Sequence, residues 1–179
     1  MTALIYRADQ WKMEQSSLKT GCLDQNGNDR PYVAAYFSDK TTGAMIIAIS
    51  AHWPHGQDES AMAELKGVIA GMPSDPPGDP SPYVQVMMAD TNTAKSNSDI
   101  AVGLGIGEPI QQADVYNTCC SNDGYSNPFD RIITSSGASS PKTIWPYGTP
   151  GTANQPPYVT DNSWEFHFPV GLEVTLNFV

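Results

Sequence analysis

The sequence predicts a single α+β domain whose core is built mainly from strands. Two runs, 44–51 (AMIIAISA) and 84–89 (VQVMMA), are apolar at nearly every position, as in strands buried on both faces. Between them, apolar residues at 62, 65, 69 and 72 recur at helical spacing. The chain has 179 residues, of which 40% are hydrophobic, so it can bury a real core within one domain.

The first part of the chain predicts an antiparallel meander. The expected strands are Ala3–Arg7, Trp11–Gln15, Pro31–Ser38 and 44–51. A turn-rich segment, Gly21–Arg30, separates the second strand from the third, and Lys40–Gly43 forms a hairpin-like connection into the fourth.

The middle of the chain predicts a β-α-β crossover. A helix is expected over Asp58–Met72 and stops at Pro73. The proline-rich loop Ser74–Pro82 then leads into the strand 84–89, at an ordinary length for such a crossover.

The last part is expected to contain fewer regular elements. A short helix is expected over Asn97–Leu104 and a strand over Arg131–Thr134. The segment Ser135–Asn162 is rich in proline, glycine and serine and is expected to be irregular. The alternating segment Gly171–Val179 is expected to close a sheet.

Polar side chains occur where these strands end. His52 follows one buried strand, Asp90 and Asn92 follow another, Asp130 precedes a third, and His167 precedes the last. In an extended chain Asp90 and Asn92 point to the same side, where they could share a cation or a phosphate. The alternative interpretation is an Asx-rich turn, a structural histidine and an ordinary ion pair. Together, polar groups at the ends of buried strands indicate a site on a rigid scaffold.

The order of these segments resembles the endonuclease/exonuclease/phosphatase superfamily, the deoxyribonuclease I-like fold. ALIYR is similar to the family's strand ending in Tyr-Arg, and AISAHWPH to its strand ending in a catalytic histidine. VMMADTN is similar to the Gly-Asp-x-Asn signature with Ala89 for glycine, and NPFDRII to the Tyr-Asp-Arg-Ile segment with Phe129 for tyrosine. EFHFPVGLEVTL is similar to Ser-Asp-His-x-Pro-Val and the final strand. The resemblance implies a two-sheet β-sandwich flanked by helices.

The resemblance also implies roles in a Mg²⁺-dependent phosphodiesterase or phosphatase. His167 is expected to be the general base, oriented by Asp130, and His52 is expected to donate to the scissile phosphate. Asp90 and Asn92 are expected to position the phosphate or water, and Mg²⁺ to offset charge on the phosphoryl oxygens. The remaining expected positions are Asp90 and Glu165 for the metal, Tyr6, Asn92 and Arg131 for substrate binding or its support, and Trp53 and His55 for the rim.

Three departures from the family pattern bear on activity. The family's metal-binding glutamate and the carboxylate that supports the phosphate-side histidine have no counterpart, so the domain is expected to lack its first strands. The aspartate before the last histidine is Phe166, and Glu165 points to the opposite face of a strand unless a bulge re-aims it. Mg²⁺ uses few carboxylates, so we expect impaired or absent catalysis. A sheet edge left uncovered is expected to require another polypeptide or a larger assembly.

Composition restricts the alternatives. Lys and Arg total 9 against 19 Asp and Glu, so the net charge of −10 gives no overall basic surface for nucleic acid. No apolar run is long enough to span a membrane. Two functions remain open, a phosphoric ester hydrolase and a non-catalytic adaptor subunit that reuses the fold. A third reading, a secreted enzyme, needs Cys119 or Cys120 bridged to a partner such as Cys22.

Overall fold

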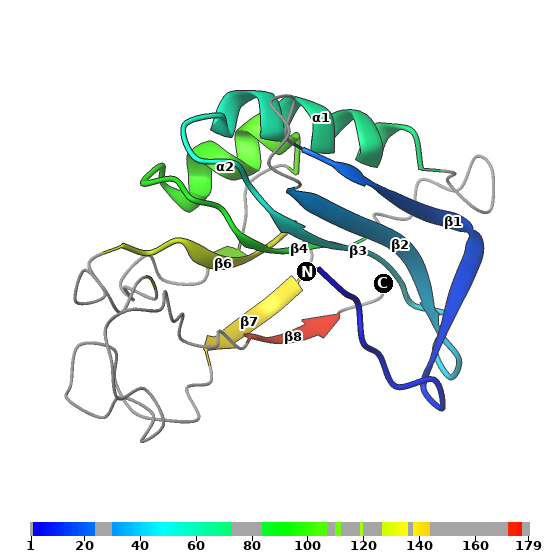
Figure 1. Cartoon of the computed structure of the whole chain (residues 1–179). Coiled ribbons are helices and arrows are strands. Elements are labelled where there is room, and N and C mark those ends of the chain that lie inside the picture. Colours follow the sequence, from blue (N-terminus) through cyan, green and yellow to red (C-terminus); the bar gives the residue numbers. More distant parts are fainter. Residues whose placement is uncertain are drawn as a thin grey trace, which may run out of the picture.

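The computed structural model contains a six-stranded mixed sheet with two helices packed on one face (Figure 1). It describes residues 2–23, 30–72, 84–106, 110–111, 119, 127–135, 138–143 and 172–176. In spatial order the sheet consists of β1 (Trp11–Cys22), β2 (Pro31–Asp39), β3 (Met45–His52), β4 (Val84–Asp90), β6 (Asp130–Thr134) and β5 (Ile110–Gln111). The helices are α1 (Asp58–Ala70) and α2 (Asn97–Leu104). The predicted α+β class is therefore confirmed.

The connections from β1 through β4 follow the predicted meander and crossover. β1, β2 and β3 form an antiparallel meander, and β3 pairs with β4 in parallel through the crossover helix α1. β6 then adds to β4 in antiparallel orientation. The central strands β3 and β4 are the two whose sequences are apolar at nearly every position, because each has a neighbour on both sides and packed side chains on both faces.

The main core lies between the sheet and the helices. Ile49 of β3, Met87 of β4 and Ile133 of β6 are almost completely buried there. Leu65 of α1 and Ile100 of α2 close the core from above. Complete burial of a side chain of this size contributes about 1.5–3 kcal/mol, so this layer fixes the sheet under the helices.

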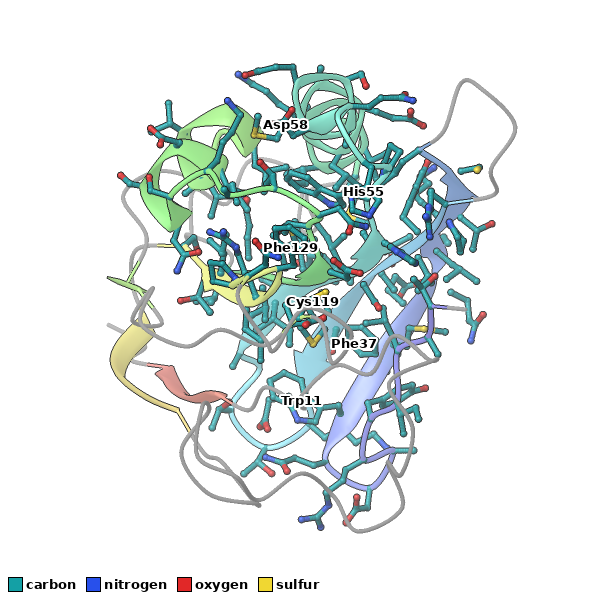
Figure 2. The ribbon with its side chains drawn as sticks, turned by 60° about the vertical axis from the view of Figure 1, so that its left-hand side comes forward. Trp11, Phe37, His55, Asp58, Cys119 and Phe129 are labelled. Carbon is teal, nitrogen blue, oxygen red and sulfur yellow. The ribbon has the colours of Figure 1, made fainter. Side chains whose placement is uncertain are left out.

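The opposite face of the sheet carries a second, smaller cluster. Phe37 and Ala48 are buried in it, and Trp11 packs against them; Figure 2 shows Trp11 and Phe37 on the same side of the sheet. The ring of Tyr6 meets Phe37 edge-on, with the ring centroids 4.9 Å apart. Residues alternate between the two faces along each strand, and this alternation decides where the strand-end side chains point.

Two predicted elements at the start of the chain are corrected. Ala3–Arg7 is not a strand; the backbone there is irregular, and the amides of Gln10 and Trp11 donate to the Arg7 carbonyl in the turn that leads into β1. β1 is much longer than the predicted Trp11–Gln15 because a bulge between Glu14 and Lys19 is filled by a side chain. The buried Ser17 hydroxyl donates to the Glu14 carbonyl and accepts from the Tyr36 amide.

A second sheet also corrects the sequence analysis. β7 (Ala138–Thr143) lies within the segment predicted to be irregular, and it pairs in antiparallel orientation with β8 (Leu172–Leu176), which falls within the predicted last strand. β7 contacts β5 of the large sheet. The sandwich arrangement of two full sheets stays a prediction.

The cysteines and the helices settle two smaller points. Cys22 is a free, exposed thiol and Cys119 is disulfide-bonded, so the bridge to Cys22 required by the third reading is wrong. In the described part of the chain, neither helix is long and apolar enough to cross a membrane.

Candidate active site

The ends of three neighbouring strands bring three of the predicted site residues together. In the register of the sheet, His52 of β3 is the partner of Asp90 of β4, and Asp90 is the partner of Asp130 of β6. Directly paired residues project to the same face of a sheet. Residues 47, 49, 51, 87, 89 and 133 face the helices. His52, Asp90 and Asp130 therefore point to the opposite face.

His52 lies between a carboxylate and a guanidinium. Its Nε2 is 3.3 Å from Oδ2 of Asp90, while Nη1 of Arg30 lies 2.9 Å from Nε2 and 3.3 Å from Nδ1. Arg30 can donate only to a ring nitrogen that carries no proton. A proton on Nε2 would be shared with Asp90 and would leave Nδ1 as the acceptor for Arg30. The His52 side chain is 30% exposed and that of Asp90 16%, so a ligand can reach both.

Arg30 is the residue that sequence reasoning missed. It ends the turn-rich segment and precedes β2, the strand that pairs with β3 alongside His52. Its Nε is buried and has no hydrogen-bond partner in the described part of the molecule. The available signal was an arginine directly before a strand predicted to neighbour the histidine-bearing strand.

Asn92 does not follow the extended geometry that the sequence analysis assumed. Its φ is 45°, the left-handed region, which among the described non-glycine residues is found only here. The backbone N–H of Asn92 donates to Oδ1 of Asp90 over 3.1 Å, which forms an Asx turn. Its side-chain Nδ2 donates to the Trp53 carbonyl over 2.8 Å. The prediction that Asp90 and Asn92 project together from an extended strand is therefore wrong, and Asn92 instead links the ends of β3 and β4.

Arg131 of β6 binds the loop after β4 through hydrogen bonds of its buried side chain. It is 5% exposed, and its guanidinium donates to the carbonyls of Pro128 and Thr93 and to Oδ1 of Asn97 over 2.8–2.9 Å. A buried guanidinium with acceptors at both ends fixes the backbone around it. This placement agrees with a supporting role.

The two predicted rim residues differ in exposure. Trp53 is completely buried, so the interpretation that it lines a rim is wrong. His55 is exposed and meets Phe129 edge-on, with ring centroids 6.3 Å apart, and Figure 2 shows the two side by side. Tyr6 packs on Phe37.

The remaining predicted residues are not tested. Glu165, Phe166 and His167 lie outside the described residues, so their predicted roles, and the dyad of His167 with Asp130, stay predictions.

The described residues do not fit a Mg²⁺ site by themselves. No group of three or more potential metal ligands occurs in the part of the chain that the structure describes. Both oxygens of Asp90 already have partners, the Asn92 amide and the His52 ring. A magnesium ion at Asp90 would have to share the carboxylate with these partners and recruit further oxygen ligands.

Comparison with known proteins identifies the fold. No family model matches the sequence, and no curated protein matches it. Among solved structures, a mannosyl-6-phosphatase from Bacteroides thetaiotaomicron aligns with a TM-score of 0.60 at 14% identity, over 96% of this chain and 69% of that one. An endonuclease/exonuclease/phosphatase from Bacteroides vulgatus aligns over the same shares with a TM-score of 0.61 at 14% identity. The catalytic domain of human Nocturnin aligns at 0.50 and 12% identity, over 76% and 51% of the two chains. The chain has the fold of the endonuclease/exonuclease/phosphatase structures.

Proposed function

We propose that this chain is a phosphoric ester hydrolase domain that binds a phosphoryl group between Arg30 and His52. The observation that carries the proposal is the contact of Arg30 with His52 and of His52 with Asp90 at the aligned ends of β3 and β4. In a chain of net charge −10 an anion needs donors placed locally, and Arg30 supplies cationic ones.

The proposed chemistry assigns a separate task to each group. In the free protein the Nε2–H of His52 is shared with Asp90, and the same N–H is donated to a phosphoryl oxygen when the substrate takes the place of the Asp90 carboxylate. Arg30 offsets the charge of the same oxygens. Asn92 positions the phosphate or the attacking water. His167 as the general base and Asp130 as its orienting carboxylate complete the proposal from the sequence resemblance.

The substrate class is a phosphomonoester or a phosphodiester. The mannosyl-6-phosphatase with this fold supports a monoester, and the acidic balance of the chain makes an extended nucleic acid the less favoured choice. The proposed activity is weak. Mg²⁺ is the proposed cofactor. Its binding is expected to be weak, because the described residues contain no group of three potential metal ligands and both oxygens of the Asp90 carboxylate already have protein partners.

Two neighbouring histidines allow a matched test. Hydrolysis of p-nitrophenyl phosphate and bis(p-nitrophenyl) phosphate should be measured with Mg²⁺ for the wild type, His52→Ala and His55→Ala. Loss of a donor to the transition state lowers kcat by about 10²–10³, so His52→Ala should approach background. His55, exposed and only three residues away, should retain the rate within about twofold. No hydrolysis by the wild type, or equal rates for both variants, would refute the proposal.

A non-catalytic adaptor subunit is the second candidate. The observation that favours it is the missing three-ligand group in the described part of the chain. An adaptor would be held in a complex with another polypeptide. Native mass spectrometry distinguishes the two, because a monodisperse monomer of 19.3 kDa that hydrolyses a phosphoester contradicts the adaptor function.

A further inference from the structure

The loop that carries Asn92 is held from two sides. This loop, residues 91–96, connects β4 to α2. From the core, Arg131 donates to the Thr93 carbonyl. From the outer side, the Thr93 hydroxyl donates to Oδ2 of Asp58 over 3.1 Å. The ammonium group of Lys95 lies 3.5 Å from the same Asp58 oxygen and 2.9 Å from Oε1 of Glu59.

These outer contacts join the connection after His52 to the connection after Asp90. Asp58 and Glu59 form the first turn of α1, which follows the short segment 53–57 after His52 (Figure 2 labels Asp58). The α1 N-cap residue Gln57 makes no side-chain cap bond, so the carboxylates of the first turn are the groups that complement the helix dipole. Lys95 approaches these two carboxylates from the loop, so their charge is offset by the loop itself.

We propose that Asp58, Thr93 and Lys95 form a latch that positions Asn92 against the end of β3, and with it the His52–Asp90 pair. Asp58, Thr93 and Lys95 are positioning residues in this account. Their role at the site rests on the proposed function, whereas the latch itself does not.

The conformation of Asn92 explains why the loop needs a latch. A non-glycine residue in the left-handed region costs about 1 kcal/mol or more and persists only when its surroundings hold it. The Asn92 side chain reaches the Trp53 carbonyl, and the Trp53 amide reaches the Asp90 carbonyl over 2.9 Å. Loss of the Asp58 contacts should therefore loosen the ends of both β3 and β4. The latch acts indirectly, because the contacts of Asp58 with Thr93 and Lys95 do not include His52.

The chain offers a matched control for the ionic part of the latch. Lys12 pairs with Glu14 at 3.7 Å on β1, at a side-chain exposure of 66%. Lys95→Met and Lys12→Met each remove one lysine from one ion-paired site. Lys95→Arg restores the charge. Thr93→Val keeps the shape of the side chain but removes both contacts of the hydroxyl, which donates to Asp58 and accepts from the Lys95 backbone amide.

Amide hydrogen exchange measures the latch without requiring any enzymatic activity. Loss of a partly exposed ion pair of ordinary strength should increase the population of the locally unfolded loop by about two- to fivefold. Lys95→Met and Thr93→Val should therefore accelerate exchange at the Asn92 and Trp53 amides by about that factor. Lys12→Met should leave these two amides unchanged, Lys95→Arg should restore protection, and 1 M salt should reduce the effect of Lys95→Met through screening.

Kinetics then test whether the latch positions the site. Lys95→Met should also lower kcat for bis(p-nitrophenyl) phosphate by about two- to fivefold. KM should change little, because orientation matters most in the transition state. Unchanged exchange at Asn92 and Trp53 overturns the latch. Faster exchange with an unchanged kcat overturns its positioning role. A wild type without hydrolysis overturns the proposed function, and exchange alone then decides the latch.

Discussion

Replacement of Arg131 by methionine tests how the candidate site is built into the fold. Arg131 is 5% exposed, and its guanidinium donates to three acceptors, the carbonyls of Thr93 and Pro128 and the amide oxygen of Asn97. These acceptors belong to three segments: the 91–96 loop, the start of α2 and the residues just before β6. Methionine fills much of the same volume but donates no hydrogen bond.

The expected loss follows from the acceptors left behind. A hydrogen bond from a charged donor contributes about 1.5–3 kcal/mol, and each buried acceptor without a donor costs about 1–3 kcal/mol. These values do not add fully, because the loop can relax and water can enter. We therefore expect Arg131→Met to lower the free energy of unfolding by about 3–5 kcal/mol, the range for breaking a buried charged network. For a chain of this length that is a decrease in Tm of about 6–20 °C.

Urea unfolding followed by circular dichroism measures the effect. Arg131→Lys keeps the charge but offers one ammonium in place of a planar fork, so it should recover less than about half of the loss. Arg7→Met is the control, since the Arg7 side chain is exposed and pairs with the nearby Asp9 across a surface turn; the urea midpoint of this variant should match that of the wild type. An Arg131→Met variant within about 1 kcal/mol of the wild type would refute the view that Arg131 anchors the loop.

Three further substitutions test packing and ionisation. Gly67→Ala in α1 should raise the free energy of unfolding by about 1 kcal/mol, because nothing lies within 4 Å of the added methyl group. Gly21→Ala should lower it by about 1–3 kcal/mol, because the new Cβ would lie 2.6 Å from the Tyr32 ring; urea midpoints measure both, and a stabilised Gly21→Ala would contradict this packing. Burial, with a smaller effect of Glu64, raises the pKa of Tyr32. The free energy of unfolding should therefore fall as pH rises above about 10, where the unfolded chain ionises this tyrosine first. Tyr32→Phe should remove this contribution, which urea midpoints compared at about pH 9 and pH 11 measure.

The elements with a strong periodic pattern could be predicted from the sequence. The strands ending at His52 and Asp90 and the crossover helix lie where apolar spacing placed them, and α2 covers the short helix expected over Asn97–Leu104. Burial on both faces makes a strand continuously apolar, and burial on one face makes a helix periodic, so these patterns are written into the residues themselves. The alignment of His52 with Asp90 at the strand ends follows from the parallel pairing of the crossover strands.

The parts that failed depend on contacts distant in sequence or on local side-chain hydrogen bonds. Ala3–Arg7 has strand-like residues, but Tyr6 packs on Phe37 from an irregular backbone while Ile5 is exposed, and propensity cannot show that. Asn92 leaves the strand because the Asp90 carboxylate accepts its amide, which competes with an extended continuation. Arg30 acquires its significance only from the pairing of β2 with β3.

Strand register, rather than any single side chain, determines the candidate site. Moving β4 by one residue against β3 would turn Asp90 to the helix face and bring Ala89 beside His52. The Trp53 amide bound to the Asp90 carbonyl and the Asn92 amide group bound to the Trp53 carbonyl oppose that shift at the strand ends. Arg131 holds the loop after β4 through the Thr93 carbonyl, and Lys95 holds it through Asp58 and Glu59, so the register and the Asn92 conformation stabilise each other. A ligand bound at His52 and Asp90 would therefore meet groups fixed by the sheet itself, which is the preorganisation that transition-state stabilisation requires.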